Sequence, residues 1–145
     1  MKNETRGIRN NNPLNIRYNK ANRWKGKVLE KHDPHFEEFV AMEYGFRAAL
    51  VMMDNYIKHH HCNTIEKIVT RWAPPSENNT ASYIGHICRM TGLGGREWIR
   101  AGSFARDEVV WAMAQIESGK GILAYREDFE QARKGDVVTK ETSPQ

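Results

Sequence analysis

The chain changes its hydrophobic period near Glu43, and this change limits the folds that it can adopt. After Glu43, apolar residues recur with the spacing of one face of a helix. The first such stripe consists of Phe46, Ala49, Leu50, Met53 and Ile57. Before Glu43, short segments alternate apolar and polar residues, as strands do. We therefore expect an α+β fold, mostly helical, with a small β lobe near the N-terminus.

The first forty residues predict that lobe. Turn-forming residues occupy 10–13 and 19–22, and residues 14–18, 27–31 and 36–40 resemble short strands. A hairpin or a three-stranded antiparallel lobe would satisfy this pattern.

Helix signals follow in the middle of the chain. Thr64 is suited to begin a helix that ends before Pro74, and Thr80 to begin one that ends at Gly92. Residues 92–102 then form a connection.

The last third contains a helix that ends at Gly119 and a short amphipathic segment over 126–135. Residues 1–135 are expected to form a single domain, and residues 136–145 a polar, frayed tail.

Composition narrows the function classes. The chain has 145 residues, 39% hydrophobic and 28% charged, and a net charge of +4. No apolar run is as long as a membrane span, so stable membrane insertion is not expected. The Lys and Arg residues suit an anionic partner but are scattered, which argues against a nucleic-acid module. The N-terminus has no secretory signal pattern, so synthesis in the cytoplasm is expected.

Two cysteines and a histidine run raise the question of a metal site. Cys62 and Cys88 are expected to be free thiols rather than a disulfide framework. Residues 59–62 read His-His-His-Cys, but consecutive helical side chains point in different directions and cannot converge on one ion. No metal and no cofactor is therefore expected.

Glu117 is the strongest catalytic candidate. It follows Met113 by four residues, on the apolar stripe of Val109, Ala112, Met113 and Ile116. Burial and the negative end of the helix dipole would both raise the pKa of such a carboxyl, as a general acid requires. In the alternative interpretation, Glu117 lies at the edge of the stripe and reaches solvent.

Four sequence blocks support a functional interpretation. They are 6–17, 24–26 with 36–39, 72–80 followed by Tyr83, and 115–119. Together they resemble blocks of lysozyme-like peptidoglycan-cleaving enzymes, namely lytic transglycosylases and autolysin-type N-acetylglucosaminidases. The glutamate block comes first in those families and last here, so the chain resembles a circularly permuted member, as among phage and prophage lytic or structural proteins. The resemblance covers residues 6–135 and implies a lysozyme-like fold.

The resemblance also implies a set of site residues. Glu117 would be catalytic, with Ser118 beside it in the Glu-Ser-Gly motif. The other substrate-binding residues would be Asn11, Asn12, Asn15, Trp24, Asn78, Thr80 and Tyr83. The residues themselves also allow simpler roles: turn formers for the asparagines, a core position for Trp24 and a helix start at Asn78 and Thr80.

The implied reaction is cleavage of peptidoglycan glycan strands. By resemblance to the lytic transglycosylases, the N-acetyl group of the substrate assists, and the same glutamate then acts as base on the sugar 6-hydroxyl to leave a 1,6-anhydro end. A muramidase or N-acetylglucosaminidase would instead hydrolyse the strand with a second carboxylate. Candidates for that carboxylate are Asp33, Glu37, Glu38, Glu43 and Glu77.

A third possibility is a non-catalytic virion component that binds the cell wall, although the intact Glu-Ser-Gly motif favours an enzyme. Action on the wall would require delivery by phage lysis machinery, a virion or a secretion system. The sequence gives no oligomeric state.

Overall fold

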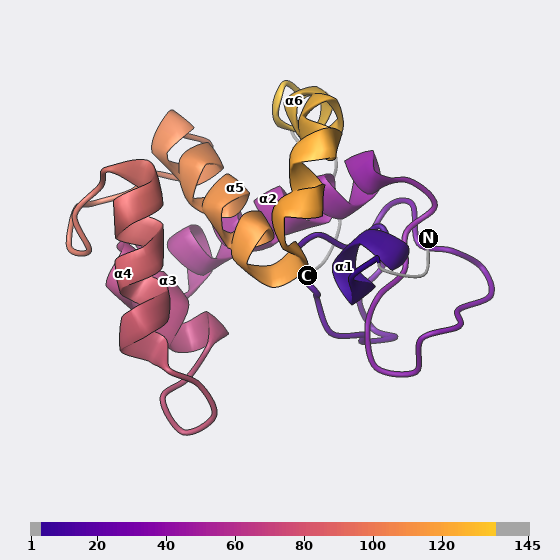
Figure 1. Cartoon of the computed structure of the whole chain (residues 1–145), viewed down its shortest axis with the longest axis horizontal. Coiled ribbons are helices and arrows are strands. Elements are labelled where there is room, and N and C mark those ends of the chain that lie inside the picture. Colours follow the sequence, from indigo (N-terminus) through magenta and orange to yellow (C-terminus); the bar gives the residue numbers. More distant parts are fainter. Residues whose placement is uncertain (1–3, 136–145) are drawn as a thin grey trace. The chain divides into compact units, whose positions relative to one another are not determined.

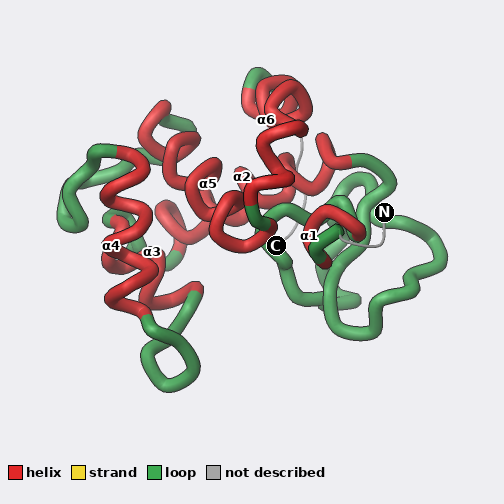
Figure 2. The backbone as a smooth tube through the Cα atoms, viewed as in Figure 1, coloured by secondary structure: helices red, strands yellow, loops and turns green. Residues whose placement is uncertain are grey.

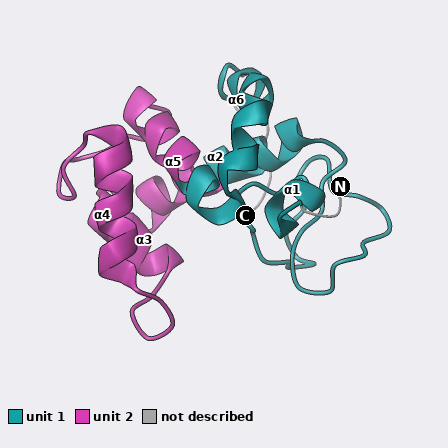
Figure 3. Cartoon of the chain, viewed as in Figure 1, with its two compact units in different colours: residues 1–51, 113–145 teal, residues 52–112 magenta. Residues whose placement is uncertain are grey.

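The computed structural model describes residues 4–135, which consist almost entirely of helices and loops (Figures 1 and 2). The elements are α1 (Arg6–Arg9), α2 (Met42–His59), α3 (Ile65–Trp72), α4 (Thr80–Thr91), α5 (Phe104–Ser118), the 3-10 helix η1 (Lys120–Tyr125) and α6 (Arg126–Arg133). The described residues fall into two compact units (Figure 3). Unit 1 comprises residues 4–51 and 113–135, and unit 2 comprises residues 52–112. The predicted tail, 136–145, lies outside the described residues.

The predicted β lobe is wrong. Residues 14–18, 27–31 and 36–40 belong to a long loop between α1 and α2, and the described part of the chain contains no sheet. Pairing is limited there to two isolated antiparallel bridges, Arg17 with Phe36 and Lys27 with Phe39. The α+β class, and with it a lysozyme-like fold built around a β lobe, is therefore replaced by a mostly helical fold.

The physical reason is that side chains take the place of a strand ladder. The Asn12 amide bonds to the backbone of Ile16 and Glu37, and the Glu38 carboxylate bonds to backbone N–H groups of His32 and Asp33. Once these backbone groups are paired with side chains, they no longer need a neighbouring strand. The alternating pattern is met only in part: Leu14, Ile16, Phe36 and Phe39 are buried, whereas Leu29 and Val40 are exposed.

The helix signals in unit 2 are confirmed, except that one helix cap lies one residue earlier than predicted. The Thr64 hydroxyl accepts from the Lys67 N–H at 3.2 Å, and Gly92 ends α4 with φ 77°. The cap of α4, however, is Asn79 rather than Thr80, because the Asn79 side chain accepts from the Ser82 N–H at 3.1 Å. Thr80 is the first residue of α4, and its hydroxyl donates to the Ala73 carbonyl.

Each unit buries its own apolar side chains. In unit 2, α3 packs against α4 and buries Ile68 and Ile87 completely. In unit 1, Leu14 from the long loop is fully buried, and the Phe46 and Phe129 rings meet edge to face with centroids 5.1 Å apart. Among residues 4–135, every helix is too short or too polar to cross a bilayer.

Candidate functional site

Glu117 is the penultimate residue of α5 and is half-buried. Gly119 ends the helix with φ 80°, and its N–H donates to the Gln115 carbonyl at 2.9 Å. A positive φ is accessible to glycine at little cost, which explains why the helix stops directly after the Glu-Ser pair. The Glu117 carboxyl is therefore carried on the last turn of a helix, as the sequence predicted.

Three hydrogen bonds attach this helix end to the N-terminal segment. The Ser118 hydroxyl donates to the Pro13 carbonyl at 2.7 Å, and the Thr5 hydroxyl donates to the Ser118 carbonyl at 2.8 Å. The Asn15 amide donates to the Glu117 carbonyl at 3.2 Å. The first and last sequence blocks, separated by about a hundred residues, thus form one local structure within unit 1.

Ser118 is fully buried and serves this attachment. Its side chain also explains the glycine at position 7, because a Cβ placed there would clash with the Ser118 Oγ. Ser118 therefore holds the helix end, and with it the Glu117 peptide, against the N-terminal segment. The resemblance had implied that Ser118 contacts the substrate.

Asn12 has a similar internal role. It is fully buried, and its Nδ2 donates to the carbonyls of Ile16 at 3.0 Å and Glu37 at 2.9 Å. Its Oδ1 accepts from the Ile16 N–H at 2.9 Å. These bonds occupy both amide hydrogens and the carbonyl oxygen, so Asn12 holds the loop in its shape.

Asn11 and Asn15 both adopt left-handed backbone conformations, with φ 52° and 53°. Asparagine tolerates the left-handed region better than most residues, so both asparagines help to form the turns in which they lie. Asn11 Nδ2 donates to the Phe39 carbonyl at 3.0 Å. Asn15 differs, because its buried Oδ1 has no hydrogen-bond partner among the described residues. Asn15 therefore keeps an unused acceptor next to the Glu117 peptide.

A cavity of about 380 Å³ adjoins this helix end. Its walls come from the N-terminal segment, the turn after α5, and η1. The lining residues are Glu4, Thr5, Ile8, Ser118, Gly119, Lys120, Gly121, Ala124 and Tyr125. Its volume falls within the usual range for small-ligand pockets, and its mixed apolar and polar walls are typical of them. Ser118 and Gly119, rather than Glu117 itself, line the cavity. The sequence interpretation missed the wall residues Thr5 and Tyr125, because no local pattern brings them to the end of α5.

Three of the candidate second carboxylates support the long loop of unit 1. Glu38 is buried, and its Oε2 accepts from the His32 N–H at 2.8 Å and from the Asp33 N–H. Glu37 is fully buried, and its Oε2 lies 3.3 Å from the Lys27 ammonium.

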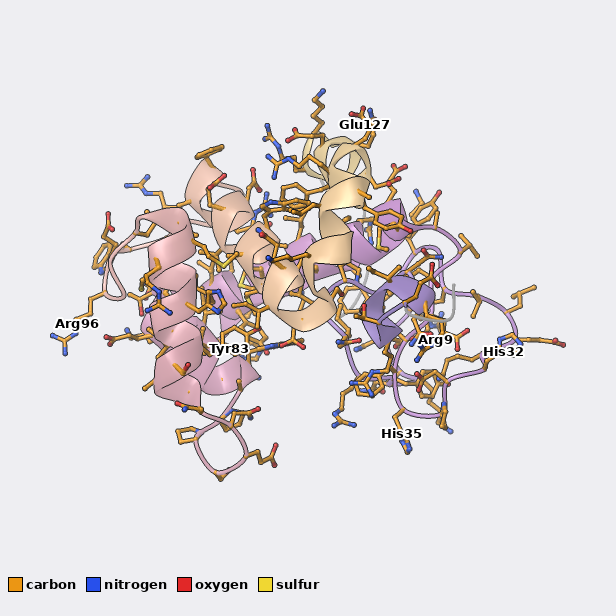
Figure 4. The ribbon with its side chains drawn as sticks, in the orientation of Figure 1. Arg9, His32, His35, Tyr83, Arg96 and Glu127 are labelled. Atoms are coloured by element: carbon orange, nitrogen blue, oxygen red, sulfur yellow. The ribbon has the colours of Figure 1, made fainter. Side chains whose placement is uncertain are left out.

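Of the three carboxyl groups, Asp33 has the most clearly altered pKa. Burial acts to raise its pKa, but hydrogen bonds from the His35 N–H, the Asn10 amide and the Phe36 N–H outweigh it, so the pKa lies below its usual value. A carboxylate held ionised in this way is suited to fixing a turn. Figure 4 labels the His32 and His35 side chains, which belong to the same loop.

The remaining two candidates for the second carboxylate, Glu43 and Glu77, lie outside the long loop. Glu43 lies in the first turn of α2 and is half-buried. Glu77 belongs to unit 2, where it is exposed and its N–H closes a turn onto the Pro74 carbonyl.

The remaining predicted site residues belong partly to unit 1 and partly to unit 2. Trp24 is only 4% exposed, so its ring packs inside unit 1. Asn78, Thr80 and Tyr83 belong to unit 2. Asn78 is exposed and donates to the Pro74 carbonyl at 3.2 Å, whereas Tyr83 is half-buried on α4 (Figure 4).

Arg47 is a buried charged residue that the sequence interpretation missed. It lies on α2 within unit 1 and is fully buried. Burial lowers its pKa to about 10, while the electrostatic effect of Tyr44 acts in the opposite direction. The local sequence does not predict this burial, because Glu43 lies one helical turn before Arg47 and an arginine is usually exposed.

Cys62 and Cys88 are free thiols, as expected, and burial raises the pKa of Cys88. Across residues 4–135, no cluster of three or more His, Cys, Asp or Glu side chains has the arrangement of a metal site.

The fold and this site define a mostly helical protein with a half-buried glutamate fixed at a helix end. No protein-family profile matches the sequence. The chain is 35% identical over 124 residues to protein P5 of Pseudoalteromonas phage PM2, an alignment that covers 84% of this chain and 76% of that protein. The chain belongs to the family of this phage protein.

Proposed function

We propose that this protein cleaves the glycan strands of bacterial peptidoglycan as a lytic transglycosylase, with Glu117 as general acid and then general base. The observation that carries the proposal is the attachment of the Glu117–Ser118 helix end to the Asn-Asn-Pro-Leu-Asn loop through Asn15 and Pro13. These bonds join two of the four blocks that together resemble peptidoglycan-cleaving enzymes. The adjoining cavity offers space for a sugar substituent.

In the proposed reaction, protonated Glu117 donates its proton to the leaving glycosidic oxygen as the bond from C1 to that oxygen breaks. The substrate's N-acetyl group stabilises the developing positive charge at C1. The Glu117 carboxylate then removes the proton of the 6-hydroxyl while that oxygen bonds to C1. The glutamate is regenerated in its protonated form, and the product carries a 1,6-anhydro ring.

The settings of the other carboxylates favour this route over hydrolysis. Hydrolysis by an ordinary glycosidase requires a second carboxylate facing the sugar. Asp33 and Glu38 are bonded to loop N–H groups, and Glu37 is fully buried beside Lys27. Each would have to give up contacts that hold the loop before it could assist at C1.

The family relationship to a phage protein supports delivery with a phage, either in the particle or during lysis. The partner would then be the wall glycan strand, reached after synthesis in the cytoplasm. The basic net charge of +4 would aid attachment to an anionic wall, in a manner that added salt weakens.

The test is digestion of purified peptidoglycan by the wild type, Glu117→Gln and Glu127→Gln, with mass spectrometry of the released muropeptides. Glu127 is an exposed carboxylate of α6 in the same unit (Figure 4), so its variant removes an equal charge without touching the site. We expect anhydro-ended products from the wild type and Glu127→Gln, and a loss of about 10²- to 10⁴-fold for Glu117→Gln. Circular dichroism of each variant establishes that it is folded.

Other outcomes contradict parts of the proposal. Hydrated reducing ends would identify a hydrolase and direct attention to Glu43, the candidate of unit 1 that lies on a helix rather than in the long loop. Equal activity of Glu117→Gln and wild type would exclude Glu117 as the acid. If no variant releases products but all of them sediment with the wall, the protein is a wall-binding component and the enzymatic proposal is wrong.

A further inference from the structure

We propose a second binding site, on unit 2, for oxyanion groups: a groove of about 550 Å³ whose charge comes mainly from Lys67 and Arg71. We call it the basic groove, and it is lined by His60, His61, Cys62, Glu66, Lys67, Thr70 and Arg71. All of these residues belong to unit 2, so the inference is independent of the proposed reaction at Glu117 in unit 1.

The two cations stand one turn apart on α3. Lys67 and Arg71 are both exposed and are separated by four residues, so their side chains share a face of the helix. Like charges at this spacing destabilise a helix, and an anion bound between them would remove that repulsion. Among residues 4–135, the Lys67 ammonium has no hydrogen-bond or ion-pair partner.

Arg71 is held in place before any ligand arrives. Its guanidinium lies 5.2 Å from the centre of the Tyr56 ring, within cation-π range. A guanidinium fixed against an aromatic ring loses less conformational freedom when it binds, and its remaining N–H groups match the paired oxygens of carboxylate or phosphate.

Glu66, the acidic residue of the lining, is turned to another partner. Its Oε1 lies 3.5 Å from the Arg96 Nε, and its side chain runs along Gly95. Figure 4 shows Arg96 on the loop after α4, pointing outward. The Glu66 charge is thus partly balanced outside the basic groove, which leaves the positive charge of Lys67 and Arg71 in excess.

The opposite wall is a tight turn that follows α2. The Tyr56 carbonyl accepts from both the His60 N–H at 3.2 Å and the Cys62 N–H at 3.0 Å, and His61 has φ 58°. A left-handed histidine is uncommon and is maintained here by the bonds around it. The turn presents two exposed imidazoles, which can donate hydrogen bonds to an oxyanion even when neutral.

The test is a titration of the ¹⁵N-labelled full chain, followed by NMR at constant ionic strength, with inorganic phosphate and separately with glutarate. We expect saturable shifts of the amides of residues 60–71. The Lys67→Ala/Arg71→Gln double variant should weaken binding about tenfold or more. Arg89→Gln removes an exposed charge of α4 outside the groove and should leave binding unchanged.

The two probes separate the sources of the oxyanion. Binding of phosphate but not glutarate supports the site and indicates a phosphate-bearing ligand, and the reverse result supports it with a carboxylate-bearing ligand such as an acidic peptide. Shifts that never saturate with either probe would overturn the proposal. An equal loss of binding in Arg89→Gln would also overturn it, because the attraction would then be general surface charge.

Discussion

The long loop of unit 1 and the helix pair of unit 2 are stabilised in different ways. In the loop, buried polar side chains such as Asn12 and Glu38 bond to backbone groups. In unit 2, α3 and α4 satisfy their own backbones and are joined by apolar side chains such as Ile68 and Ile87. The difference shows that a segment without sheet or helix can still be specified closely, provided that its backbone partners are side chains.

The candidate site combines a helix with the polar loop. Glu117 is carried by a helix, but its peptide is attached to the polar loop by Asn15 and Ser118. Polar contacts depend on direction and distance more strongly than apolar contacts do. A loop built from them is suited to fixing a reactive carboxyl, whereas the apolar contacts of unit 2 mainly supply stability.

The largest effect is expected from Ile68→Ala in unit 2. The side chain is fully buried, so its removal leaves a cavity and should lower the free energy of unfolding by about 3–4 kcal/mol. Urea denaturation followed by circular dichroism measures this change. Ile57→Ala, at a half-buried position of the same unit, is the control and should cost clearly less. Equal losses would mean that the α3–α4 contact is not the centre of this core.

A loss of about 2–3 kcal/mol is expected from Asn12→Ala, because two carbonyls and one N–H lose their partner in a buried place. Asn78→Ala, at an exposed position in unit 2, should change the free energy of unfolding by no more than about 0.5 kcal/mol. Hydrogen exchange would report faster exchange at the Ile16 amide in Asn12→Ala. If Asn12→Ala is as stable as the wild type, the polar bonds do not hold the loop.

A smaller effect, about 1 kcal/mol, is expected from Asn79→Ala, which removes the side-chain cap of α4. Asn79→Ser retains a capping oxygen and should restore most of the loss. Thermal unfolding of the three proteins measures both changes. If Asn79→Ser is as unstable as Asn79→Ala, the Asn79 side chain does not cap α4.

How far the sequence could predict the structure follows from the distance between partners. Thr64 caps α3 by bonding to Lys67, three residues later, and Gly92 ends α4 through its own backbone conformation. Both signals involve neighbouring residues and can therefore be recognised in the sequence. The bonds from Asn12 to Glu37 and from Ser118 to Pro13 span 25 and 105 residues. No periodicity encodes such partners, and the alternation in the loop is equally compatible with strands.

The same reasoning applies to the site. Glu117 at a helix end was predictable, because Gly119 is the next residue but one and marks the stop. The buried position of Arg47 and the cavity walls at Thr5 and Tyr125 were not, because they depend on tertiary contacts. The hydrogen bond from Asn15 to the Glu117 carbonyl also depends on tertiary structure and was not predictable either.

The smallest effect is expected at Asp33, whose carboxylate holds a turn of the long loop and depends on pH. The pKa of Asp33 is lower in the folded chain than its ordinary value of about 3.9. A carboxyl with a depressed folded pKa contributes stability above the unfolded pKa and loses it as pH falls through the folded value. Asp33→Asn should therefore be slightly less stable than the wild type at pH 7, and the difference should disappear toward pH 2. Urea denaturation across this pH range measures it, with Glu30→Gln, an exposed neutralisation in the same loop, as control. A difference that stays constant down to pH 2 would mean that the Asp33 charge plays no part and that only the shape of the side chain holds the turn.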